Sequence, residues 1–352
     1  MQLTTIGIDL AKNVFQVHAT DSHGRKVFNK SVIRASLVDF IARQQPSLIG
    51  MEACSGAHYW ARRFQAFGHT VRLMAPQFVK PYVKSNKNDA ADAEAICEAV
   101  ARPNMRFVPL KNTEQQAILS LHRIRQGMVQ TRTAQVNQIR GLMAEFGIVI
   151  QRGRHHLQSE LPALLEDADN ELPGLLRVTV MEELERLHEL NARALVLEKR
   201  IQQWHRSNEE SRKIADIPGI GPLTATALIA SIGDATNFEN GRQLSAWLGL
   251  VPRQHSSGGK QNLLGISKRG DKYLRTLLIH GARTVLQHKQ RRLKAGLADD
   301  NGWLCSVAER RSQNKAVVAL ANKNVRTIWA LLAHGRTYDP QWAKERQMMT
   351  AE

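Results

Sequence analysis

The sequence predicts an α/β plus α protein, with a mixed sheet and its covering helices first, a helical arm second and a mainly helical region last. Three observations predict this order. Short apolar runs alternate with helical periodicity in the first third, long helical spacing fills the middle, and helices separated by glycine-rich turns follow. We therefore expect three domains, over residues 1–108, 109–205 and 206–352.

The first third begins with three segments that have the pattern of antiparallel strands. Residues 5–8 are a short apolar run, and residues 13–20 alternate apolar and polar side chains as a half-buried strand does. Turn residues at 21–24 lead into a returning strand at 26–31. Helices and strands then alternate, with helices expected at 35–43 and 57–67 and strands at 48–51 and 69–73, before two further helices.

Four carboxylates in this region point to phosphodiester chemistry. Asp9 and Glu52 each follow a buried strand, which predicts both at one edge of the sheet, and Asp89 and Asp92 share one face of a predicted helix. Alone, Asp9 is also typical of a turn at a strand end, and Asp89 of a helix N-cap. Together they can converge only around a cation, because their repulsion would raise their pKa values. Mg²⁺ or Mn²⁺ suits such ligands, and two ions can hold both reacting oxygens of a phosphodiester.

The charge distribution predicts a polyanionic partner. The chain has 49 Lys and Arg against 32 Asp and Glu, a net charge of +17. Residues 1–108 and 206–352 are both basic, whereas the middle is neutral because residues 155–205 are acidic. Basic regions of this kind are typical of nucleic-acid binding, and 5% aromatic residues argue against recognition by base stacking.

The run GIDLAK also resembles the first phosphate loop of actin-like kinases. That fold needs a second, similar half with another phosphate loop, and no such repeat follows in this sequence.

The middle of the chain predicts a helical arm. Residues 113–146 have apolar side chains at helical spacing among Arg and Gln, and residues 147–153 are expected to end that helix. Leu161-Pro162 and residues 172–174 are expected to interrupt the chain again. From residue 184 to 204 apolar side chains recur every three or four positions, the pattern of a coiled coil. An intramolecular hairpin and a hairpin that also dimerises both fit this pattern.

The last third carries a glycine turn and a serine loop. In DIPGIGPLTA, Gly219 and Gly221 allow close backbone approach before a helix whose N–H groups can meet a phosphate, as in helix-hairpin-helix DNA binders. The later run from Ser256 to Gly259 is typical of a flexible loop, but basic residues flank it. Cations beside a serine can bind the phosphate that the serine attacks. The candidate nucleic-acid contacts there are Arg253, Lys260, Lys268 and Arg269, and the candidate nucleophiles are Ser256, Ser257 and Ser267.

Five motifs in order resemble the DEDD-type transposases of the insertion-sequence "one-ten" family, in its "eleven-eleven" branch, to which Piv DNA invertases are related. The resemblance covers about residues 1–335. The motifs are GIDLAK, MEACSGAHYWAR, KNDAADAEAI, IPGIGPLTATAL and GLVPRQHSSGGKQNLLGISKRGDKYLRTLL.

This resemblance implies a RuvC-like (RNase H-like) domain, a coiled-coil insertion and a C-terminal transposase domain. It implies that Asp9, Glu52, Asp89 and Asp92 bind Mg²⁺ or Mn²⁺, and that Ser257 becomes joined to DNA, with Ser256 as the fallback. It also implies a structured guide RNA encoded by the element, double-stranded DNA at element ends and target, and homodimers that assemble into a tetramer with composite active sites.

We therefore expect a DNA transposase that cuts and rejoins strands through a serine nucleophile. One alternative is a RuvC-like junction resolvase that uses metal-activated water and forms no protein–DNA adduct. Another is an architectural nucleic-acid-binding protein whose acids are structural. Three cysteines without a paired framework and no apolar run of about 18 residues favour a cytoplasmic protein without a membrane partner.

Overall fold

The computed structural model describes residues 3–84, 88–297 and 302–340. The chain divides into two compact units, Met1–Gln115 and Gln116–Glu352. The tail after residue 337, to which the sequence assigns no function, lies largely outside the described residues. Across the described ranges, no helix combines the length and the apolar character that a membrane crossing requires.

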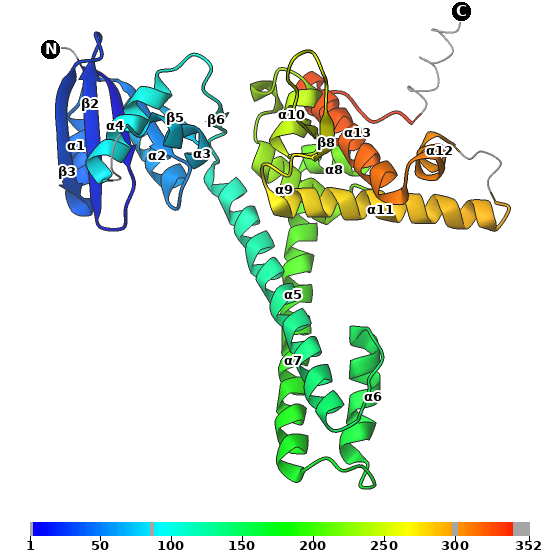
Figure 1. Ribbon diagram of the computed structural model, residues 1–352. Helices are drawn as coiled ribbons and strands as arrows, with labels where there is room; N and C mark the ends of the chain where they lie inside the picture. The colour runs from blue at the N-terminus through cyan, green and yellow to red at the C-terminus, as the bar shows by residue number, and fades with distance from the viewer. Residues whose placement is uncertain (1–2, 85–87, 298–301, 341–352) are drawn as a thin grey trace, which may run out of the picture. The chain divides into compact units, whose positions relative to one another are not determined.

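The first unit contains a six-stranded mixed sheet in the order β3-β2-β1-β4-β5-β6 (Figure 1). The first three strands are antiparallel, β4 and β5 run parallel to β1, and β6 is antiparallel to β5. The predicted mixed α/β class is confirmed, and the two-residue β6 is the one strand of this sheet without a sequence prediction. The strands are β1 (Leu3–Asp9), β2 (Val14–Asp21), β3 (Lys26–Ile33), β4 (Leu48–Glu52), β5 (Thr70–Met74) and β6 (Phe107–Val108).

Helices cover both faces of this sheet. On one face the alternating apolar residues of β1 and β2, such as Ile8 and Phe15, pack against α1 and α2 through Leu37 and Trp60. The other face lies against α4, which contributes Ile96 among others. The helical segments are α1 (Arg34–Ala42), α2 (Ala57–Gln65), α3 (Pro76–Val79), η1 (Lys80–Tyr82) and α4 (Asp89–Val100).

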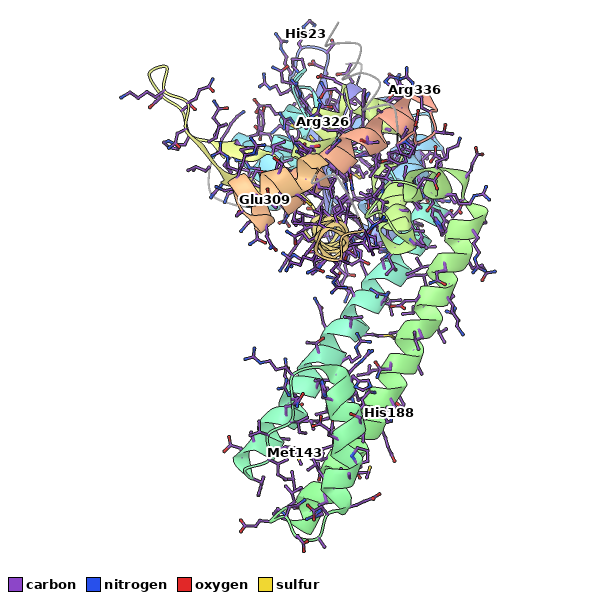
Figure 2. The ribbon with its side chains drawn as sticks, turned by 90° about the vertical axis from the view of Figure 1, so that its right-hand side faces the viewer. His23, Met143, His188, Glu309, Arg326 and Arg336 are labelled. Atoms are coloured by element: carbon purple, nitrogen blue, oxygen red, sulfur yellow. The ribbon has the colours of Figure 1, made fainter. Side chains whose placement is uncertain are left out.

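The arm is an intramolecular hairpin of α5 (Thr113–Glu145) and α7 (Gly174–Ser207), with α6 (Arg154–Glu166) beside its far half, near Met143 and His188 in Figure 2. Most of the predicted apolar positions of α7 are buried, namely Leu184, Leu187, Ala194, Leu197 and Ile201. The predicted break at Leu161-Pro162 is wrong, because Pro162 lies inside α6. Proline removes one helical hydrogen bond there, but buried Leu161 packs the helix into the arm core.

The last helices surround α9, which is almost wholly buried. A two-stranded hairpin of β7 (Pro252–Gln254) and β8 (Leu263–Ile266) extends away from them (Figure 2). The helices are α8 (Glu209–Ala215), α9 (Pro222–Ile232), η2 (Ala235–Asn237), α10 (Gly241–Trp247), α11 (Lys272–Lys294), α12 (Gly302–Arg310) and α13 (Gln313–His334).

Candidate functional site

Asp9 and Glu52 end two neighbouring parallel strands. Ile8 pairs with Met51 in the register of β1 and β4, so the two acids follow side by side at the same edge of the sheet. Both are half-buried. The pKa of the nearby Cys54 thiol is raised, mainly by its burial and then by Glu52 and Asp9. The structure thus brings these two candidate ligands together.

Two glycines allow α4 to lie directly on this sheet. A Cβ atom at Gly7 would lie 2.3 Å from the Ala93 carbonyl oxygen, and one at Gly50 would lie 2.7 Å from a side-chain atom of α4. Side chains alternate along a strand, so Asp9 and Glu52, each two positions further on, point to the face that α4 covers. The sequence signal for this contact is the glycine two residues before each acid, which our sequence reasoning missed.

Three polar side chains connect the sheet to the first turn of α4. Gln16 lies opposite Asp9 in the register of β1 and β2. Its amide oxygen accepts a hydrogen bond from Ser31 Oγ at 2.7 Å, and its Nε2 donates to Asn29 Oδ1. Asn29 Nδ2 in turn donates to the Ala90 carbonyl oxygen at 3.2 Å. This chain of hydrogen bonds fixes the beginning of α4 over β2 and β3.

Asp89 and Asp92 occupy that first turn of α4. Asn88 caps the helix by accepting a hydrogen bond from the Ala91 N–H at 2.8 Å, and acids in a first turn favour the helix dipole. Across the described ranges, no three His, Cys, Asp or Glu side chains form a group that could hold a metal ion. Asp9 and Glu52 therefore supply a pair of hard oxygen donors suited to Mg²⁺ or Mn²⁺, and the helix acids are not gathered with them.

Two of the three candidate serines, Ser256 and Ser257, lie at the tip of the β7–β8 hairpin. The Lys260 N–H donates to the Ser257 carbonyl at 3.0 Å, which closes a turn over Gly258 and Gly259. Both glycines have positive φ, +55° and +77°, as a type I′ hairpin turn requires. The run that the sequence favours as a flexible loop therefore has the backbone of a hairpin turn.

The two neighbouring serines differ in their hydrogen bonds. Ser256 Oγ accepts from Gln254 Nε2 at 3.0 Å and from the Asn262 N–H at 3.2 Å, so its hydroxyl holds the hairpin together. Within the described part of the chain, the exposed Ser257 hydroxyl forms no hydrogen bond. Ser267 accepts at 3.4 Å from the Arg269 N–H at the base of the hairpin. Ser257 is thus the candidate serine whose hydroxyl is not engaged in its own hairpin.

Close backbone contacts fix the base of the hairpin. A Cβ atom at Gly249 would lie 2.0 Å from the Arg269 carbonyl oxygen, and one at Gly270 would lie 2.0 Å from the Trp247 carbonyl oxygen. Buried Arg275 donates to the Arg269 carbonyl at 3.3 Å. The side chains of the predicted nucleic-acid contacts are all exposed on this segment, namely Arg253, Lys260, Lys268 and Arg269.

The predicted glycine turn connects α8 to α9, but its two glycines have different surroundings. Gly219 has φ +90° and its backbone packs against Gly281 of α11. Buried Asn324 donates to the Pro218 carbonyl at 2.9 Å from the other side. Gly221, by contrast, is exposed with open space beside it, at the N-cap of α9. The sequence predicts that a DNA phosphate approaches the backbone of this turn closely. At Gly219 the group that approaches closely is instead the backbone of α11.

A buried histidine that the sequence did not single out joins the arm to the last helices. His122 of α5 lies 2.9 Å from Tyr273 Oη through Nδ1 and 2.9 Å from Thr226 Oγ1 through Nε2. Thr226 Oγ1 donates to the Pro222 carbonyl at 2.8 Å, so it accepts from Nε2–H and leaves Nδ1 to accept from the tyrosine. Burial, and then Arg125, lower the pKa of His122 to about 4, so the imidazole is neutral.

Comparison with known proteins finds two family models that match this chain. Residues 6–148 match an IS110 DEDD model described as "Transposase", and residues 211–297 match the model described as "Transposase IS116/IS110/IS902 family". The first match contains all four candidate acids, and the second contains the glycine turn and the serine hairpin.

Individual relatives are similar along almost their whole length. A probable family 20 transposase of Pseudomonas aeruginosa is 50% identical, over 97% of this chain and 100% of the relative. The transposase for insertion sequence element IS1111A of Coxiella burnetii is 46% identical, over 95% of this chain and 90% of the relative. The transposase for insertion sequence element IS1328 of Yersinia enterocolitica is 40% identical, over 96% and 98% respectively.

Proposed function

Since the chain belongs to the IS110 family of insertion-sequence transposases, and is thus a DNA transposase, we propose that it breaks and rejoins DNA through a covalent bond to Ser257. The observation that carries the proposal is the contrast at the hairpin tip. The Ser256 hydroxyl accepts two hydrogen bonds within the hairpin, whereas the exposed Ser257 hydroxyl forms none in the described part of the chain. A nucleophile must reach its phosphate, and a hydroxyl engaged in its own loop does so less readily.

The reaction at Ser257 conserves the phosphodiester energy. The serine oxygen forms a bond to phosphorus, its proton passes to solvent or a base, and the bond to one deoxyribose oxygen breaks to leave a free hydroxyl. Attack by another strand's hydroxyl reverses the step and releases the serine. Exposed Arg253 and Lys260 on the same hairpin can bind the phosphate and stabilise its developing charge.

The acids of the first unit are proposed as the metal site. Asp9 and Glu52 would hold Mg²⁺ or Mn²⁺ between two strand ends. Asp89 and Asp92 of α4, which are not gathered with that pair, would complete the ligand set if the bound ion draws them towards the strand ends. A bound divalent ion would supply Lewis-acid stabilisation of the phosphate oxygens. The strand order and the mixed sense of the sheet support an RNase H-like, RuvC-like domain here.

The proposed partners extend to RNA and to further copies of the chain. Basic termini around a neutral arm suit a structured guide RNA together with DNA, and sequencing the RNA retained by the purified protein tests this. Homodimers and their tetramer would use arm surface outside the hairpin core, where Leu175 and Val178 of α7 are exposed. We retain residues 1–108, 109–205 and 206–352 as the proposed domains.

A labelled DNA substrate carrying an element end tests the serine proposal. We expect the wild-type protein with Mg²⁺ to form an adduct that survives denaturing electrophoresis, and mass spectrometry of the DNA-linked peptide to identify Ser257. Ser257→Ala should form no adduct while keeping its DNA affinity. Ser256→Ala is the matched control, and it should retain the adduct at a reduced rate because the hairpin loses two hydrogen bonds.

Two results would overturn the proposal. An adduct retained by Ser257→Ala would move the nucleophile elsewhere. Cleavage by the wild-type protein without any adduct would indicate a resolvase-like enzyme that uses activated water.

A further inference from the structure

The arm contains a polar cavity away from the serine hairpin. Its volume is about 240 Å³, and it is lined by residues from all three arm helices, Arg132 of α5, Arg154 of α6, and Asn191, Ala194, Leu195 and Glu198 of α7. A water molecule occupies about 30 Å³ of liquid, so this space has room for a phosphate group and several waters.

Two guanidinium groups in this cavity share one neutral acceptor. Arg132 Nη1 and Arg154 Nη1 donate to the same Asn191 Oδ1, at 3.1 Å and 2.8 Å. The acid in the lining, Glu198, already accepts two hydrogen bonds at one oxygen from Arg125, at 2.8 Å and 2.5 Å. The two arginines that face the cavity therefore have a neutral amide as their common partner.

The cavity has a positive electrostatic environment. Burial lowers the pKa of Arg132, and the neighbouring Arg154 and Arg125 lower it further, while Glu198 opposes them. Arginine remains charged in proteins, so three positive groups outnumber one carboxylate around this space. Guanidinium groups bind phosphate oxygens through paired charge-assisted hydrogen bonds.

We propose that Arg132 and Arg154 form a phosphate-binding site in the arm, which takes one backbone phosphate of the DNA on which the transposase acts. The family membership supplies the ligand class, because a DNA transposase meets phosphodiesters. The site extends the DNA contact surface from the serine hairpin to the arm. It rests on the DNA-acting function and is independent of the serine chemistry.

Full-length variants in a Ser257→Ala background separate the two proposals, because that change removes the chemistry and leaves binding. We expect Arg132→Gln with Arg154→Gln to weaken DNA duplex binding about tenfold in fluorescence anisotropy. The slope of log affinity against log salt concentration should become shallower by about 0.9, the value for one lost phosphate contact.

One further variant excludes a merely structural role. Asn191→Asp keeps both arginines and the shape of the cavity, but it gives them an anionic partner. The hydrogen bonds that connect α5, α6 and α7 through residue 191 would be kept or strengthened in this variant, so its unfolding midpoint should not fall. DNA affinity and salt slope should nevertheless decrease as in the arginine double variant.

Arg193→Gln is the matched control for charge. Arg193 is exposed on α7. It lies two residues after Asn191, about half a helical turn, so it is on the opposite side of the helix. We expect this variant to keep the wild-type salt slope.

Four results would overturn the proposal. Arginine variants that lower stability but leave the salt slope unchanged would make the cluster structural, and an equal loss in Arg193→Gln would indicate diffuse surface charge. If the arginine double variant binds DNA as the wild type does, two further results would assign the site to another phosphate source. These are stabilisation of the wild-type protein by inorganic phosphate and weaker binding of the double variant to an RNA duplex.

Discussion

Gly219 and Gly281 pack backbone against backbone. A Cβ atom at Gly281 would lie 1.9 Å from the Gly219 carbonyl oxygen, and one at Gly219 would lie 2.9 Å from the Gly281 carbonyl carbon and oxygen. The turn before α9 is thus part of the packing of the last helices as well as a candidate DNA contact. The two glycines of this turn can be separated experimentally.

We expect Gly219→Ala to destabilise the protein and Gly221→Ala to affect DNA binding. Gly219 has φ +90° and no room for a methyl group, so its variant should lose about 1–3 kcal/mol of unfolding free energy. Gly221→Ala should cost less than about 1 kcal/mol, because its backbone is extended and its surroundings are open. The added methyl lies before the first N–H groups of α9 and should weaken DNA binding several-fold. Urea unfolding and anisotropy measure the two effects, and equal stability losses would contradict this division.

The hairpin base offers a second comparison between glycines. Gly249 has φ +73° and touches the Arg269 carbonyl, whereas Gly265 in β8 has open space around it. We expect Gly249→Ala to displace the hairpin and reduce formation of the Ser257 adduct at least tenfold, and Gly265→Ala to retain it within about twofold. Adduct yields should be compared at a temperature where circular dichroism shows both variants folded. Similar yields would mean that the base does not position the serine.

The hydrogen-bond chain beneath α4 should affect metal affinity. Asn29→Ala removes the bond to the Ala90 carbonyl, and groups that orient metal ligands are worth about 10–100-fold in affinity. We expect calorimetry to show at least tenfold weaker Mn²⁺ binding for Asn29→Ala and none for Asp9→Asn. Ser31→Ala is the matched control. Ser31 lies at the end of this series of hydrogen bonds that is further from α4, so its loss should have a smaller effect. Wild-type affinity in Asn29→Ala would show that the chain does not position the acids.

The sequence was sufficient for those parts of the fold that depend on local pattern. Alternation along residues 13–20 and the turn at 21–24 identify β2 and its hairpin because one face of that strand is buried. The adjacency of Asp9 and Glu52 could also be predicted, since both end short buried strands.

Features that depend on tertiary contact could not be predicted. Pro162 is tolerated within α6 because Leu157, Leu161 and Leu165 pack the helix into the arm core. Helix propensity, which depends on local sequence, contains no information about this packing. Gly219 has the same signature whether a phosphate or another helix approaches it. The convergence of Arg132 and Arg154 on Asn191 brings together residues of three successive helices that are 59 and 37 positions from Asn191.

The buried His122 should make stability depend on pH. Its pKa is about 4 in the folded protein against an ordinary value of 6.5, so between these values the unfolded chain binds a proton that the folded chain does not. Stability is therefore unaffected by this group above about pH 6.5 and falls as the pH decreases towards 4. The difference corresponds to about 2 kcal/mol between pH 7 and pH 5, and urea unfolding at both values should show that His122→Gln loses this part of the dependence. His188→Gln, which alters an exposed histidine of α7, should retain it. An identical pH dependence in His122→Gln and the wild type would show that the imidazole is not held neutral between Tyr273 and Thr226.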